Sequence, residues 1–137
     1  MPTEISPTAE RLLLVDLSER ERHELREQLV DAGYEVAVAL SHADAWVQLL
    51  TWRAHGIIAD GDFAGTEVAK LADLIRRAAP TPVSVVFLCQ QHPPGEVPAT
   101  VLLKPITFLD LLATLRVSLA ALDDAPIAGG WTTPKGE

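Results

Sequence analysis

Short apolar segments alternate with longer helical patterns along most of this 137-residue chain. The apolar segments have the length and composition of strands that are buried on both faces of a parallel sheet. They are residues 11–15, 34–40, 56–59, 83–88 and 100–103. The helical segments, several of which begin with a capping pattern, are residues 18–33, 41–53, 66–79 and 107–122. This order predicts an α/β fold, a doubly wound five-stranded parallel sheet with helices on both faces.

One segment breaks the alternation, between the fourth and fifth predicted strands. Residues 89–99 contain one glycine and three prolines, which are Pro93, Pro94 and Pro98. Proline disrupts a helix interior because it has no amide N–H to donate and its ring clashes with the preceding turn. We therefore expect a proline-rich loop here, where continued alternation would require a fourth helix.

Length, charge and cysteine content limit the functions open to the chain. One domain over residues 11–122, with tails at 1–10 and 123–137, accounts for the whole sequence. A net charge of −8 without a basic run argues against binding to nucleic acid or to an anionic membrane. The single cysteine, Cys89, excludes an internal disulfide and a thiolate zinc site. No apolar run could span a bilayer and no signal segment precedes residue 11, so we expect a cytoplasmic protein.

Three charged residues follow or end predicted strands. Asp16 ends the first strand, Asp60 the third and Lys104 the fifth. Functional residues of doubly wound sheets gather at the carboxyl ends of the strands. Two carboxylates and an ammonium group at that edge could bind a divalent cation and a phosphoryl group. Each residue could also be a solvated strand terminus, but three at equivalent positions favour a shared site.

These positions lie within stretches that resemble the receiver domain of two-component response regulators. The matching stretches are Leu12-Leu-Leu-Val-Asp16, Asp31-Ala-Gly-Tyr-Glu-Val36, Gly56-Ile-Ile-Ala-Asp60, Ile75-Arg76, Pro82-Val83 and Lys104-Pro105. The resemblance extends from about residue 11 to residue 122. It implies a flavodoxin-like receiver fold and a regulatory protein, not an enzyme, whose partner is a histidine kinase or an output protein.

The resemblance also assigns roles to residues. It implies that Asp60 is the phosphoacceptor and that Lys104 pairs with the phosphoryl group. An acidic pair after the first strand would hold Mg²⁺ together with Asp60, and a Ser or Thr at the end of the fourth strand would contact the phosphoryl group. Asp16 occupies the first position of the acidic pair.

The sequence departs from this pattern at two positions, one that would bind the metal ion and one that would carry the hydroxyl group. Leu17 replaces the second acid, and Mg²⁺ requires oxygen ligands. The remaining candidate ligands are Asp16, Asp60 and Asp62, although Asp62 could instead cap or solvate its turn. The position of the switch hydroxyl falls at Phe87, and the two residues after it also lack a hydroxyl.

Two hypotheses follow. The first is a degenerate receiver that acts by protein–protein interaction, with Mg²⁺-dependent phosphorylation impaired or absent and with Asp60 and Lys104 kept as a structural ion pair. The second is a phosphoacceptor receiver in which a histidine kinase phosphorylates Asp60 while Asp16 and Asp62 hold the metal. The sequence favours the first, because the metal site and the hydroxyl are both altered.

The last predicted helix is apolar over more than one face. Helical spacing places Phe108, Leu112, Leu115 and Leu119 on a core face. The residues predicted to lie on its flanks are Leu109, Leu111 and Leu122. Without a fourth helix this flank would be exposed and would favour a homodimer. The alternative is that the proline-rich loop covers it.

The second predicted helix has a similar excess of apolar residues. The spacing predicts a core face of Ala43, Trp46, Val47 and Leu50. Leu49 and Trp52 then fall away from the core.

Overall fold

The computed structural model describes residues 10–15, 17–61, 68–93, 95, 97 and 99–124. The strands are β1 (Arg11–Val15), β2 (Glu35–Ala39), β3 (Gly56–Asp60), β4 (Ser84–Cys89) and β5 (Thr100–Leu103). The helices are α1 (Glu19–Asp31), α2 (His42–Trp52), α3 (Val68–Ala78) and α4 (Phe108–Ala120), followed by a short 3-10 helix η1 (Ala121–Asp124). The predicted order of strands and helices is confirmed. Both predicted tails fall almost wholly outside the described residues.

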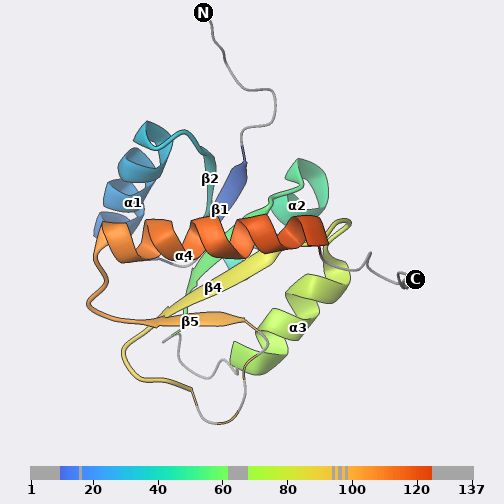
Figure 1. The fold of residues 1–137 in the computed structure, drawn as a ribbon. Coiled ribbons are helices and arrows are strands. Elements are labelled where there is room, and N and C mark those ends of the chain that lie inside the picture. Colours follow the sequence, from blue (N-terminus) through green and yellow to red (C-terminus); the bar gives the residue numbers. More distant parts are fainter. Residues whose placement is uncertain are drawn as a thin grey trace, which may run out of the picture.

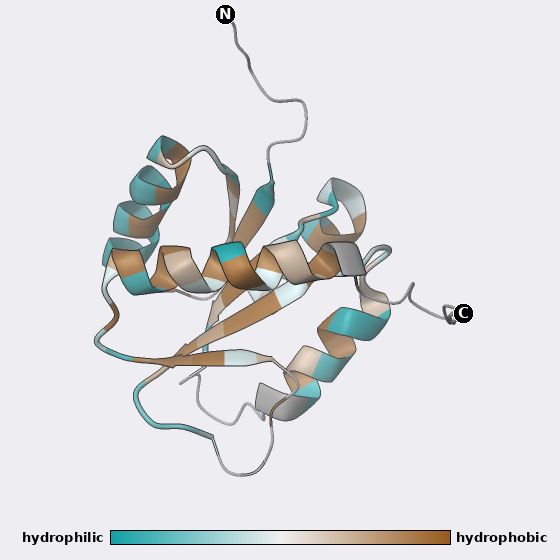
Figure 2. Ribbon diagram, in the orientation of Figure 1, coloured by the Kyte–Doolittle hydropathy of each residue, from teal (hydrophilic) through white to brown (hydrophobic). Residues whose placement is uncertain are grey.

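The five strands form one parallel sheet in the order β2-β1-β3-β4-β5 (Figure 1). This arrangement confirms the predicted doubly wound α/β fold. Successive side chains of a strand point to opposite faces, so β1 contributes Leu12 and Leu14 to one face and Leu13 and Val15 to the other. Figure 2 shows the hydrophobic residues along the central strands, whereas α1 is mostly hydrophilic.

The hydrophobic core therefore has two parts, one on each face of the sheet. The α1/α4 core consists of Leu12, Leu14, Leu17, Leu29, Ile58, Val86, Leu88, Leu111, Leu115 and Leu119. The α2/α3 core consists of Leu13, Val15, Ala39, Leu49, Ala54, Ile57, Ala59, Ala72, Ile75, Ala79, Val83, Val85, Phe87 and Cys89. Burial of both strand faces explains why the strands are continuous apolar runs and do not alternate with polar residues.

Local capping interactions begin the helices where the sequence predicts. Ser18 caps α1 in a complete capping box with Glu21, and the hydroxyls of Ser41 and Thr107 cap α2 and α4. After α1, Gly33 has a φ of 104°, a left-handed conformation that an L side chain rarely adopts. The chain can therefore turn sharply into β2.

The segment between β4 and β5 contains no helix among its described residues, 90–93, 95, 97 and 99. The predicted loop is confirmed within that part; Pro94 and Pro98 lie outside it. Val97, Ala99 and Val101 are half-buried and pack against the α2/α3 core. Leu103 at the end of β5 is exposed. The described apolar residues of the loop, Val97 and Ala99, thus pack on the α2/α3 side of the sheet, and α4 packs on the other side.

The predicted faces of two helices are partly wrong. In α4 the buried residue is Leu111, together with Leu115 and Leu119, although Leu111 was expected on the flank. Leu109 is exposed, as expected, and Leu122 packs against the α1/α4 core. In an apolar helix, several stripes satisfy the same spacing, and contact with the sheet decides which is buried.

The helix α2 shows the same effect. Leu49 is buried, whereas Val47 and Leu50, which the spacing placed in the core, are exposed. Trp46 and Trp52 pack against the α2/α3 core. Among the described residues, no helix has the length and hydropathy of a membrane span.

Candidate functional site

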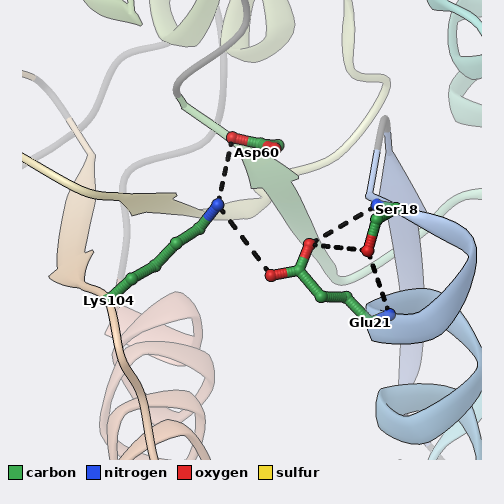
Figure 3. Close-up of polar contacts among 4 residues, drawn as sticks. All are labelled: Ser18, Glu21, Asp60 and Lys104. Carbon is green, nitrogen blue, oxygen red and sulfur yellow. Dashed lines mark hydrogen bonds and ion pairs between the residues drawn. The ribbon is translucent and has the colours of Figure 1, made fainter.

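Asp60 and Lys104 meet at the carboxyl edge of the sheet (Figure 3). Asp60 is the last residue of β3, and Lys104 directly follows β5. Strand β4 lies between them, and the lysine side chain reaches past its end. The Lys104 Nζ lies 3.5 Å from Asp60 Oδ1, and the two side chains are 20% and 22% exposed. The sheet therefore brings together two of the three charged residues that the sequence singled out.

Backbone hydrogen bonds fix the positions of these residues against β4. The Gly61 amide donates to the Leu88 carbonyl at 2.9 Å, and the Lys104 amide donates to the Cys89 carbonyl at 2.7 Å. Gly61 also approaches the side chain of Cys89 so closely that a Cβ at this position would clash with its sulfur. Glycine is therefore required directly after Asp60.

Glu21, in the first turn of α1, is a third member of the site. Its Oε2 lies 3.9 Å from Lys104 Nζ. Its Oε1 accepts hydrogen bonds from the Ser18 hydroxyl at 3.2 Å and from the Ser18 amide at 3.4 Å. The sequence predicted the capping box but not the contact with the lysine. The contact could have been expected from the position of Glu21, because the helix after β1 begins at the same sheet edge as Asp60 and Lys104.

The Leu17 side chain is part of the hydrophobic core and has no oxygen that could bind a metal ion. It is buried in the α1/α4 core with Leu29, Leu88 and Leu111. The position at which the receiver pattern has its second acid therefore contributes apolar packing and no oxygen.

The end of β4 offers no hydroxyl to the site. Leu88 is in register with Asp60, and Leu88, Phe87 and Cys89 are all buried. The hydroxyl of Ser84, at the start of β4, donates to the Ser118 hydroxyl at 2.8 Å. This hydroxyl therefore joins β4 to α4 at the end of the strand opposite to the site.

The predicted magnesium ligands are only partly within the described residues. Asp16 and Asp62 lie outside them, and Asp60 is inside. Among the residues that the structure describes, no group of three His, Cys, Asp or Glu side chains could hold a metal ion. Mg²⁺ needs several oxygen ligands, and of the three predicted ligands the structure describes Asp60 alone.

No protein-family model and no curated protein matches the sequence. Solved structures do match. A response regulator receiver protein from Sinorhizobium medicae is 25% identical over 85% of this chain and 99% of that chain, with a TM-score of 0.69. The chemotaxis protein CheY4 of Vibrio cholerae is 26% identical over 81% and 99%, with a TM-score of 0.70.

A more distant match is a response regulator from Burkholderia pseudomallei with a phosphorylated aspartic acid, a calcium ion and citrate. It is 18% identical over 84% of this chain and 71% of that chain, with a TM-score of 0.65. The chain thus has the receiver fold, and the proteins that it resembles are response regulator receiver domains. These similarities support a receiver role in two-component signalling.

Proposed function

We propose that this chain is a degenerate receiver that acts by protein–protein interaction, without a Mg²⁺-dependent phosphorylation switch. The observation that carries the proposal is the end of β4, where Leu88 lies in register with Asp60 and no hydroxyl follows or precedes it within one residue. A phosphoryl group shifts a conformational equilibrium only through contacts that differ between the two states. Without a hydroxyl at this position, such a contact is missing.

Leu17 supports the same proposal from the metal side. Charge on a transferring phosphoryl group must be neutralised, and receiver-type chemistry relies on a metal ion for part of this. An apolar residue in the core at this position leaves the metal with fewer oxygen ligands. In this proposal the protein is cytoplasmic, is not an enzyme, and has a histidine kinase or an output protein as its partner.

The alternative is a phosphoacceptor receiver in which Asp60 takes a phosphoryl group from a histidine kinase. The pairing of Asp60 with Lys104 at a partly exposed edge favours it. The similar response regulator from Burkholderia pseudomallei carries a phosphorylated aspartic acid. Here Asp16 and Asp62 would complete the magnesium site with Asp60.

One experiment separates the two. The protein is incubated with Mg²⁺ and acetyl phosphate, and its intact mass is measured alongside Asp60→Asn and the matched surface control Asp73→Asn. We expect no phosphate adduct in any of the three. An adduct on the wild type and on Asp73→Asn that disappears in Asp60→Asn would overturn the degenerate receiver and establish the alternative.

A second copy of the chain is the protein partner that α4 fits. The exposed residues Leu109, Ala113, Val117 and Ala120 recur along one side of the helix. Two exposed charged residues flank this stripe, Asp110 next to Leu109 and Arg116 next to Val117. Two antiparallel copies related by a two-fold axis would therefore bury the stripe and bring opposite charges together.

Sedimentation velocity over a range of concentrations tests this homodimer. We expect the wild type to dimerise and Val117→Lys to be monomeric, with Leu74→Lys on the exposed side of α3 as the matched control. A wild type that stays monomeric at every concentration, or equal loss in both variants, would rule out the α4 interface.

A further inference from the structure

The ammonium group of Lys104 lies between carboxylates from two different parts of the chain. Asp60 approaches from β3 at 3.5 Å, and Glu21 approaches from α1 at 3.9 Å (Figure 3). The side chains of Lys104 and Glu21 are 20% and 37% exposed, respectively. Partial burial makes this contact less screened than an ordinary surface ion pair.

The capping box orients the Glu21 side chain independently of its contact with Lys104. Its Oε1 is bonded to the hydroxyl and the amide of Ser18, while its Oε2 faces Lys104. The two oxygens thus serve different partners. By contrast, Glu24 on the same helix pairs with Arg20, and both of those side chains are well exposed. Glu21 loses less conformational entropy in meeting its partner, because the capping box has already oriented it.

Glu21 also lines a groove of about 740 Å³ between α1 and the start of α4. The other wall of this groove includes Lys104, Thr107 and Phe108. A change in how Lys104 divides its attraction between the two carboxylates would therefore alter a surface beyond the Asp60 site.

We propose that Glu21 is a positioning residue that couples the charge on Asp60 to the first turn of α1 through Lys104. The inference rests on the proposed role of Asp60 and Lys104 as a receiver-like site. When Asp60 loses its charge, Lys104 turns further toward Glu21 and strengthens the capping box.

Hydrogen exchange of the Ser18 amide, measured by NMR, reports this coupling directly, because that amide donates to Glu21 Oε1. In Lys104→Gln we expect the amide to exchange about two- to five-fold faster, the range of a weak ion pair. In Asp60→Asn we expect slower exchange. Introducing Asp60→Asn into Lys104→Gln should have no effect on the amide, because the lysine carries the coupling.

Three variants distinguish positioning from simple capping. Glu21→Gln keeps a capping-box side chain but removes the charge, so adding Lys104→Gln to it should not change Ser18 exchange further. Lys104→Arg keeps the cation and should restore most of the wild-type protection. Glu24→Gln, the matched control on the same helix, should leave the Ser18 amide unchanged.

The inference is overturned if Lys104→Gln leaves Ser18 exchange at the wild-type rate, or if the effect of Asp60→Asn persists without the lysine. The first result would mean that Glu21 only caps the helix, and the second would mean that Asp60 affects α1 by a route other than Lys104. The measurements use neither Mg²⁺ nor a phosphodonor. A phosphate adduct would therefore overturn the degenerate receiver but not this coupling, and a failed coupling would leave the adduct experiment unaffected.

Discussion

Both edges of the sheet carry a cluster of charged side chains, and the two clusters are built differently. At the amino edge, Arg11 lies 3.6 Å from Glu35, donates to the Trp52 carbonyl at 2.9 Å and stacks over the Trp52 ring at 5.9 Å. At the carboxyl edge, Lys104 lies between Asp60 and Glu21. Each cluster therefore has a central cation, but the groups around it differ.

The amino-edge cluster satisfies backbone groups. Arg11 binds the carbonyl at the end of α2, and the Arg11 amide donates to His55 Nδ1 at 2.9 Å. The side chains of Arg11 and Glu35 are 41% and 52% exposed, so solvent screens the ion pair between them. Fold stability alone accounts for these residues. At the carboxyl edge, Lys104 is less exposed than Arg11, and two carboxylates, Asp60 and Glu21, face it. This difference supports placing the proposed site at the carboxyl edge.

The largest effect should come from the apolar layer beneath the carboxyl edge and not from the charges of either cluster. Phe87 is fully buried in the α2/α3 core. We expect Phe87→Ala to lower the free energy of unfolding by about 3 to 5 kcal/mol, as measured by urea denaturation. Gln91→Ala, at an exposed position beyond β4, is the control and should be nearly neutral. A loss in Phe87→Ala below that of the charge variants would contradict this ranking.

Removing one carboxylate at each edge compares the clusters directly. Asp60→Asn should lower the free energy of unfolding by about 1 to 2 kcal/mol, between the values for exposed and buried pairs. Glu35→Gln, at the more exposed amino edge, should cost about 0.5 kcal/mol or less. Thermal and urea unfolding of the two variants check the order. A more stable Asp60→Asn would show that Asp60 is retained for chemistry at the expense of stability.

The next largest difference between the two clusters should be the salt dependence of their ion pairs. Between about 0.1 M and 1 M NaCl the screening length falls from about 10 Å to about 3 Å. In double-mutant cycles, we expect the coupling of Arg11 with Glu35 to fall over this range, and that of Lys104 with Asp60 to change less because both side chains are more buried. Equal salt dependence would remove the distinction between the two edges.

The smallest effect is expected at alkaline pH, near the amino edge. Burial, with a further contribution from the charge of Glu10, raises the pKa of Tyr34 above its ordinary value. The folded state therefore favours the neutral phenol, and stability should fall as the pH rises above about 10. Tyr34 is the single tyrosine, so tyrosinate absorbance reports its titration. A midpoint at or below the ordinary value would contradict this, and Tyr34→Phe should lose this part of the alkaline destabilisation.

Much of the fold could be predicted from the sequence because its determinants are local. The apolar run from Arg11 to Val15 and the capping box of Ser18 and Glu21 are set by neighbouring residues, and the structure contains both as predicted. The buried face of α2 could not be predicted in this way. Leu49 and Leu50 are both compatible with helical spacing, and only contact with the sheet buries the first and exposes the second.

The candidate site was predictable in part for the same reason. Strand order and the position of charges at strand ends predicted that Asp60 and Lys104 would meet. The contact of Glu21 with Lys104 depends on how α1 packs beside the sheet, since the two residues are far apart in the sequence. No local pattern marks such a contact.

A titration with Mg²⁺, followed by amide NMR shifts in the wild type, tests the central claim that the carboxyl edge is an ion-pair cluster without a competent metal site. The account predicts no saturable shifts at Asp60, Gly61 or Lys104 beyond those that the same concentration of Mg²⁺ produces at the exposed pair of Asp73 and Arg77. Saturable shifts confined to Asp60, Gly61 and Lys104, and absent in Asp60→Asn, would contradict it.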